Sequence, residues 1–392
     1  MGPRLSALAS PGPEGPIASH HTRNRMNCNR FAHHGRVGEG CRNCSFIVEI
    51  DNFMCLGIGI CTSQSPGHGP GQEAAMPGAY AHITLASRCV NPSVLGSLEL
   101  DTETVGKLMQ QVGYFQLGAI SPDMPYLVGL GTNKQAIAWA DRMHWKNVSE
   151  RIGAGVAAVS NLEGDVQNKC LAWLLGFVEH IIFDVFMHPV VNNIAGGAYS
   201  DETKGRHQWC EMNQDVYILM RECLITDISN AKIVEAVIKT LHASCDKCAM
   251  DQDVRSVFDE MLRTADSDLY ADNVPDIDGW FASFVSKMQI QEGNSILSGI
   301  GRHVNWHLVY PAAAQRNQEF LENLPVPENT PLSHLRTYDA LFDHARSLVN
   351  DHWRKVTRAV IGIEPYNPNW FAGWNLDTGE KTEEISQFWR QL

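Results

Sequence analysis

Apolar residues recur at helical intervals along most of the chain after residue 76. The segments 230–243 and 336–361 space their apolar side chains three or four residues apart, and strand-like alternation is scarce. Two stretches are predicted to be loops: 272–279, which contains three aspartates together with asparagine, proline and glycine, and 325–331, which contains three prolines. The pattern predicts an all-α domain built from many helices.

One apolar segment carries polar residues at four-residue steps. The run 177–189 is largely hydrophobic, but His180, Asp184 and His188 interrupt it. In a helix over about 171–188, steps of four keep these three side chains on one slowly drifting face. Buried imidazoles and a carboxylate are costly unless something neutralises them, and a metal ion does so. The alternative for an isolated pair is a buried cluster in which histidine is hydrogen-bonded to aspartate.

Further metal-binding side chains lie on both sides of this segment. His207 and Glu211 repeat the four-residue step downstream, and His82, Asp123 and His144 lie upstream. Imidazole and carboxylate groups without thiolate suit a catalytic zinc site with an open position better than a closed structural site. The sequence therefore predicts eight metal ligands: His82, Asp123, His144, His180, Asp184, His188, His207 and Glu211.

The order of these residues resembles the zinc-dependent phospholipase C family, whose trinuclear zinc site is also used by related single-strand-specific nucleases. The family order is a histidine, an aspartate, a histidine, His-x-x-x-Asp, a histidine and His-x-x-x-Glu. The segments 76–82 and 121–123 also resemble the corresponding segments of this family. The resemblance covers roughly 76–215 by motif, and it implies a phospholipase C or nuclease-like helical fold with two or three Zn²⁺ ions.

The resemblance also implies separate roles for the ligands. The first zinc would have four of them: Asp123, His144, His180 and Asp184. Asp184 would bridge to a second zinc that His82 helps to hold. The third zinc would have three ligands: His188, His207 and Glu211. Asp123 and Asp184 are the predicted catalytic carboxylates, Asp184 as the bridge and Asp123 as the group that orients or deprotonates the attacking water.

The implied function is zinc-dependent phosphodiester hydrolysis of the phospholipase C type, in which a zinc-activated water cleaves a phospholipid or related phosphodiester. A single-strand-specific zinc nuclease is one alternative, with Trp139, Trp145 and Trp209 near the ligands as stacking platforms for unpaired bases. A non-catalytic zinc-binding helical module is another. The chain departs from secreted family members, in which the free amine of an N-terminal tryptophan completes one site, because residues 1–75 precede Met76.

Composition and charge narrow the expected partners. The chain has 392 residues, 44% of them hydrophobic, and a net charge of −13, which gives no basic footprint for duplex nucleic acid or an anionic membrane. Transient contact with a membrane surface is compatible with a phospholipid substrate. The segment 171–191 is long enough to span a bilayer, but its ionisable residues argue against a transmembrane helix. No signal peptide is recognisable, so a cytoplasmic location is expected.

Composition also divides the chain. Residues 1–75 are rich in glycine and proline, which interrupt every periodicity, and they are predicted to be a disordered extension. Residues 76–392 are predicted to form the zinc-dependent phospholipase C-like domain. Its metal motifs lie in 76–215, and 216–392 is its helical C-terminal part.

Several other polar residues receive weaker predictions. The cysteines show no disulfide spacing and are expected to be free thiols, including the pair Cys245 and Cys248. The pair at 303 and 307 is expected to consist of core or surface histidines. Asp141 and Glu179 lie beside proposed ligands, where acceptors for the imidazole N–H groups are expected.

Overall fold

The computed structural model describes residues 78–223, 249–292, 317–381 and 387–389, all within the compact unit Gly69–Leu392. These residues form helices and contain only two isolated β-bridges, which confirms the all-α prediction. The α-helices are α1 (Ala79–Cys89), α2 (Pro92–Gly96), α3 (Thr102–Met109), α4 (Val112–Ile120), α5 (Lys134–Trp145), α6 (Val148–Ser160), α7 (Gly164–Ala195), α8 (Lys204–Cys223), α10 (Gln252–Ala265), α11 (Ser267–Asp272), α12 (Ile277–Glu292) and α14 (Tyr338–Val360). Short 3₁₀ helices are η1 (Met124–Gly131), η5 (Gln318–Phe320) and η6 (Pro368–Trp370).

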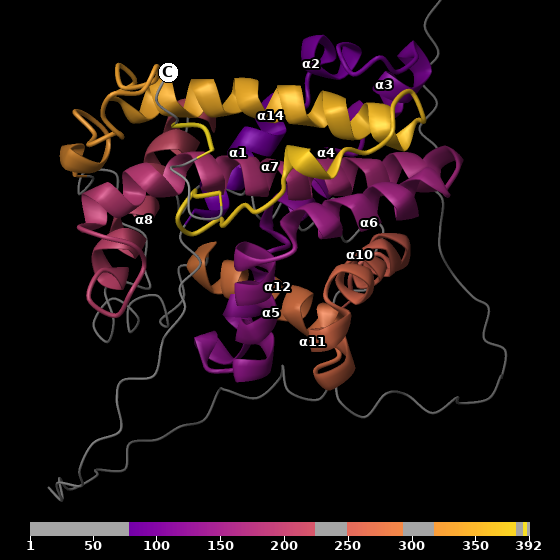
Figure 1. The fold of residues 1–392 in the computed structure, drawn as a ribbon, viewed down its shortest axis with the longest axis horizontal. Coiled ribbons are helices and arrows are strands. Elements are labelled where there is room, and N and C mark those ends of the chain that lie inside the picture. Colours follow the sequence, from indigo (N-terminus) through magenta and orange to yellow (C-terminus); the bar gives the residue numbers. More distant parts are fainter. Residues whose placement is uncertain (1–77, 224–248, 293–316, 382–386, 390–392) are drawn as a thin grey trace, which may run out of the picture. The chain divides into compact units, whose positions relative to one another are not determined.

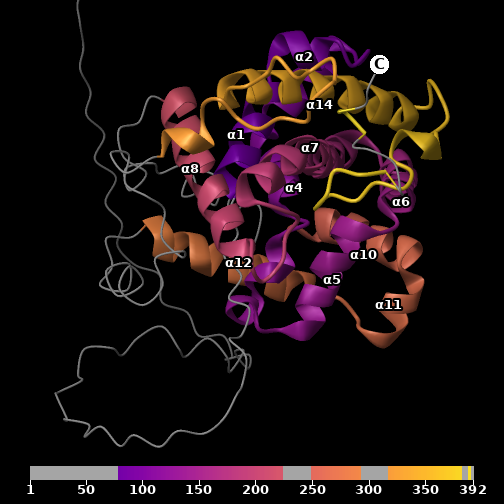
Figure 2. The same ribbon diagram turned by 60° about the vertical axis from the view of Figure 1, so that its left-hand side comes forward.

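Helix α7 is the central element of this unit. It contacts α1, α4, α6, α8, α10 and α14, and Figure 2 shows it almost end-on with other helices around it. In Figure 1, α14 runs across the bundle above α7. By length and composition α7 could cross a membrane, but its most apolar window is completely buried. A helix that is apolar on all sides and enclosed in this way is a core helix.

Helix α7 is longer than the sequence predicted. The expected limits of about 171–188 are wrong at both ends. The helix begins at Gly164, and it continues through Pro189 to Ala195, after which Gly196 ends it in the left-handed region at φ 95°. Proline removes only one backbone donor, and the packing around α7 carries the helix through that position. The six residues after Pro189 keep the C-terminal end of α7 beside the rest of the site.

Helices α4 and α7 approach each other more closely than any residue with a side chain would allow. A Cβ atom at Gly118 would stand 2.0 Å from the carbonyl oxygen of Trp173, and one at Gly176 would stand 2.0 Å from that of Phe115. The two glycines therefore set the distance between these helices. This close crossing brings the backbone of Ala119 within hydrogen-bonding distance of His180.

Other sequence predictions have mixed outcomes. The predicted helix over 336–361 is confirmed as α14, and Cys89, Cys170 and Cys210 are free and buried. The predicted loop over 272–279 is shorter, because α12 begins at Ile277. Four predicted features lie outside the described residues: the extension 1–75, the helix 230–243, the pair at 245 and 248, and the pair at 303 and 307.

Candidate metal centre

Helix α7 presents His180, Asp184 and His188 at successive turns, as the four-residue spacing predicts. His180 and Asp184 are buried, and the side chain of His188 is 12% exposed. The other predicted ligands come from separate elements: His82 from α1, Asp123 from the residue before η1, His144 from α5, and His207 and Glu211 from α8. The structure brings all eight together in three adjoining groups.

The first group is a tetrad of Asp123, His144, His180 and Asp184. Nε2 of His144 lies 3.1 Å from Oδ1 of Asp123 and 3.4 Å from Nε2 of His180. Nε2 of His180 lies 3.0 Å from Oδ2 of Asp184 and 3.8 Å from Oδ1 of Asp123. Tetrahedral zinc with bonds of about 2.0–2.1 Å keeps its ligand atoms about 3.3 Å apart. The donor types and distances of this tetrad fit zinc.

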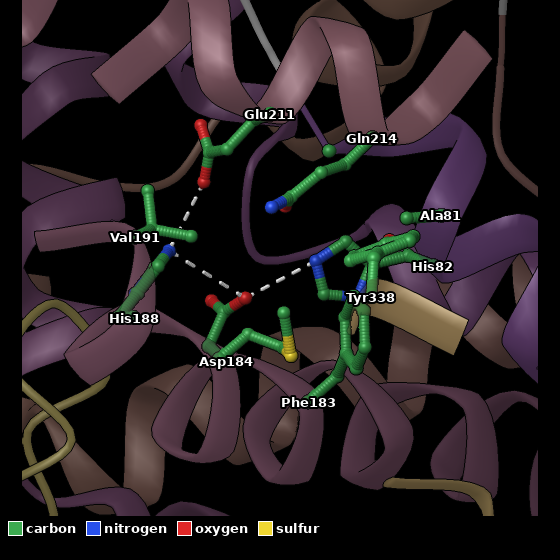
Figure 3. Close-up of a pocket in the computed structure, with 11 residues that line it drawn as sticks. Ala81, His82, Phe183, Asp184, His188, Val191, Glu211, Gln214 and Tyr338 are labelled. Carbon is green, nitrogen blue, oxygen red and sulfur yellow. Dashed lines mark hydrogen bonds and ion pairs between the residues drawn. The ribbon is translucent and has the colours of Figure 1, made fainter. Parts of the chain in front are cut away.

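The second group consists of His82, His180 and Asp184, and it shares His180 and Asp184 with the first group. The two oxygens of Asp184 face different neighbours in the centre. Oδ2 faces His180 and, at 3.7 Å, His144, whereas Oδ1 lies 3.1 Å from Nε2 of His82 and 3.9 Å from Nε2 of His188. Figure 3 shows Asp184 between His82 and His188, with contacts to both. The carboxylate is therefore placed to serve two neighbouring ions, as the bridging prediction requires.

The third group joins the end of α7 to α8. Oε1 of Glu211 lies 3.3 Å from Nε2 of His188 and 3.2 Å from Nε2 of His207. These spacings also fit zinc. Three protein ligands leave a tetrahedral ion with one open position, which is the arrangement of catalytic zinc sites.

Asp215 holds the N-terminus of α1 in place. Its carboxylate accepts hydrogen bonds from the backbone N–H groups of Gly78, at 3.0 Å, and Ala81, at 2.7 Å. Asp215 stands one turn after Glu211 on α8, so the same helix that carries Glu211 anchors the helix that carries His82. The imidazole of His82 then stacks on that of His180, with ring centroids 4.3 Å apart.

Backbone carbonyl groups orient three of the histidine ligands. Nδ1 of His144 contacts the carbonyl oxygen of Ala140 and Nδ1 of His180 that of Ala119, both at 2.8 Å. Nδ1 of His188 contacts the carbonyl oxygen of Leu376 at 2.5 Å. A ring that donates from Nδ1 presents the lone pair of Nε2, so each contact selects the form that binds a metal.

His82 has a different partner. Its Nδ1 faces Oε1 of Glu179 at 3.5 Å, and within the part of the chain that the structure describes neither carboxylate oxygen of Glu179 has a hydrogen-bond partner. Glu179 therefore stands where an imidazole acceptor was expected. Asp141 does not, because Nδ1 of the nearby ligand His144 contacts the carbonyl oxygen of Ala140, and the carboxylate of Asp141 accepts a hydrogen bond of 2.9 Å from the hydroxyl of Tyr126.

The carboxylates and imidazoles of the centre each stabilise the charged form of the other, which shifts their pKa values. Burial alone would lower the pKa of His188, but Asp184 and Glu211 outweigh burial and raise this pKa to about 10. Burial likewise opposes the charged form of His144, yet Asp123 and other acids raise its pKa to about 9. For Glu211, burial is outweighed by His207 and His188, which lower the pKa to about 2. A zinc ion bound at His144 or His188 would therefore compete with a proton for the imidazole.

A small pocket opens beside the carboxylate of Asp184. Its lining combines ligands with apolar side chains, namely Gly78, Ala81, His82, Phe183, Asp184, Met187, His188, Val191, Glu211, Gln214 and Tyr338. Tyr338 comes from α14, and its buried hydroxyl has no hydrogen-bond partner in the described part of the chain. Sequence reasoning missed Tyr338 and Leu376, because neither belongs to a motif and Leu376 acts through its backbone.

The fold and the site together define an all-helical protein whose clustered imidazoles and carboxylates are consistent with a multinuclear metal site. The family described as zinc dependent phospholipase C matches residues 81–268, a span that contains all eight predicted ligands. Residues 81–268 belong to the zinc-dependent phospholipase C family, a family of phosphodiester hydrolases. Searches of the curated proteins and of the solved structures returned no match.

Replacing Glu179 with glutamine tests its part in holding His82. We expect Glu179→Gln to weaken zinc binding at the site that contains His82 by about 10–100-fold, because a neutral amide holds the imidazole N–H less strongly than a carboxylate. Zinc affinity measured by competition with a chelator checks this. Asp259→Asn is the control and should leave the affinity unchanged, since Asp259 lies on α10 and accepts a hydrogen bond from Tyr270. Equal affinities for both variants would contradict the role of Glu179.

Proposed function

We propose that the protein is a zinc-dependent hydrolase of the phospholipase C type, which cleaves a phospholipid or related phosphodiester to release a phosphorylated head group. The observation that carries this proposal is the arrangement of eight ligands in three adjoining groups with Asp184 between them. Its membership of a phosphodiester hydrolase family supports the reaction type. The choice of a lipid substrate and a cytoplasmic location remain predictions.

The residues of each group have separate roles in this proposal. Two or three zinc ions would be held by the eight ligands. Zinc bound there supplies Lewis acidity toward phosphoryl oxygens and lowers the pKa of water. Asp184 holds the two sides of the centre at a fixed spacing. The side chain of Asp123 is 14% exposed, against 7% for Asp184, and we assign it the acceptance of a proton from the attacking water.

A nuclease with the same metal centre is the second candidate. The structure removes Trp139 as a stacking platform, since it is 1% exposed and its Nε1 donates to the carbonyl oxygen of Asn273. Trp145 is 46% exposed and follows His144 directly, so it is placed to stack an unpaired base near the ligands. This one observation keeps single-stranded nucleic acid as an alternative substrate.

Assays on zinc-loaded protein separate the candidates. We expect elemental analysis to find two or three zinc ions per chain, and phosphatidylcholine vesicles to release a phosphorylated head group. Single-stranded DNA is the parallel substrate. Cleavage of DNA without lipid hydrolysis would favour the nuclease. A zinc-loaded protein that hydrolyses neither would favour a non-catalytic zinc-binding module, and protein without zinc would contradict all three.

A further inference from the structure

A turn near the C-terminal end of the chain lies against the metal centre. This C-terminal turn, residues 374–381, is outside the family-matched span 81–268. It is closed by backbone hydrogen bonds of 2.9 Å from Asn375 to Glu380 and from Gly379 to Asn375. A β-bridge between Trp374 and Lys381 closes its base. The turn is thus a defined element with its own hydrogen bonds.

The peptide groups of one residue in this turn contact two predicted ligands. The N–H of Leu376 donates a hydrogen bond of 2.8 Å to the backbone carbonyl of His144, at the end of α5. The carbonyl oxygen of Leu376 accepts from Nδ1 of His188 at 2.5 Å. His144 belongs to the tetrad and His188 to the third group, so Leu376 links the two groups through the backbone.

Three contacts fasten the turn. The side-chain amide of Asn192 on α7 donates to the carbonyl oxygen of Asp377 at 2.8 Å. Nε1 of Trp145 donates to a carboxylate oxygen of Asp377 at 2.5 Å. Gly379 lies so close to α7 that an added Cβ would stand 2.5 Å from both the carbonyl oxygen of Val185 and Cγ of Pro189.

The close approach of Gly379 follows from the proline inside α7. Pro189 has no N–H, so the carbonyl of Val185 has no helical donor four residues on. Gly379 packs against this point with φ 69°, a conformation that suits glycine. The turn therefore fits α7 one residue away from His188.

We propose that the C-terminal turn is a positioning element of the metal centre. The carbonyl of Leu376 fixes the imidazole of His188 with Nε2 toward Glu211, and its N–H ties this contact to α5. This proposal rests on the zinc site proposed above. Displacing the turn removes no ligand, but it removes the partner that orients one, and losses of that kind lower metal affinity about 10–100-fold.

Gly379→Val is the direct test, and Gly362→Val is its matched control. Both glycines have positive φ, at 69° and 75°, but nothing lies within 4 Å of a Cβ at Gly362. Both variants place valine at a similar positive φ, and only Gly379→Val pushes the turn away from α7. We expect Gly379→Val to bind its weakest zinc ion about 10–100-fold less tightly, measured by chelator competition and by zinc content after dialysis, with Gly362→Val like the wild type.

A milder pair of variants decides the matter if Gly379→Val does not fold, as judged by circular dichroism. Asn192→Ala removes a side-chain hydrogen bond to the turn, whereas Asn193→Ala removes one of equal length, 2.8 Å, to the carbonyl oxygen of Pro325. We expect weaker zinc binding in Asn192→Ala alone. Unchanged zinc affinity in a folded Gly379→Val variant, or in Asn192→Ala where Gly379→Val does not fold, would overturn the positioning role. A wild type without zinc would contradict this role and the proposed function together.

Discussion

We expect the Asp184→Asn variant to lose at least about 1,000-fold in kcat/KM for phosphodiester hydrolysis and to retain fewer zinc ions than the wild type. The carboxylate has one oxygen 3.0 Å from His180 and the other 3.1 Å from His82, so each side of the centre has its own oxygen. Asparagine keeps the shape but offers one oxygen and no charge. Lewis-acid stabilisation is worth several kcal/mol, and about 4 kcal/mol corresponds to about 1,000-fold in rate.

The measurement pairs steady-state kinetics with zinc content determined by elemental analysis. Asp259→Asn is the control, since Asp259 lies on α10 and its carboxylate accepts a hydrogen bond from Tyr270. We expect the control to keep the wild-type activity and zinc content. An Asp184→Asn variant with full zinc content and wild-type kcat/KM would show that Asp184 is not a bridging ligand.

The second large effect is on folding. We expect Gly176→Ala to lower the free energy of unfolding by about 3 kcal/mol, at the upper end of the usual cost of overpacking a core. The added methyl group would stand 2.0 Å from the carbonyl oxygen of Phe115, and a backbone atom cannot turn aside as a side chain can. Helices α4 and α7 must separate, which also strains the hydrogen bond of 2.8 Å between His180 and Ala119.

Denaturant unfolding followed by circular dichroism measures this loss. The matched control is Gly106→Ala in α3, where nothing lies within 4 Å of the added Cβ atom. Removing a glycine from a helix interior without a clash should stabilise the protein by about 0.5–1 kcal/mol. The two substitutions are chemically identical, so changes of opposite sign in the free energy of unfolding would come from the helix crossing alone. A Gly176→Ala variant as stable as Gly106→Ala would contradict the close packing of α4 and α7.

Much of the helical architecture and the whole set of candidate ligands could be predicted from the sequence. His180, Asp184 and His188 share a face because the helical repeat is local, and their donor atoms belong to the residue types themselves. The limits of α7 could not be predicted, because Pro189 normally ends a helix and only the packing around it lets the helix continue. Local sequence does not record that packing.

The roles of neighbouring acids show the same division. Asp141 and Glu179 looked equivalent in the sequence, since each lies close to a predicted ligand. In the structure Glu179 faces His82 at 3.5 Å, whereas Asp141 accepts a hydrogen bond from the hydroxyl of Tyr126. Which acid serves a histidine depends on the approach of α1 to α7, and this distance is set far away along the chain, in part by Asp215.

The sequence by itself determined which side chains are available to bind zinc and on which helical face three of them lie. The tertiary structure decided which ligand atoms stand about 3 Å apart, which oxygen of Asp184 faces each side, and that the peptide of Leu376 orients His188. The physical reason is that helical periodicity and donor chemistry are local properties of residues. Distances between helices depend on where a glycine meets a backbone carbonyl group of another helix. Every residue type has a carbonyl group, so no sequence motif marks the ones that make these contacts.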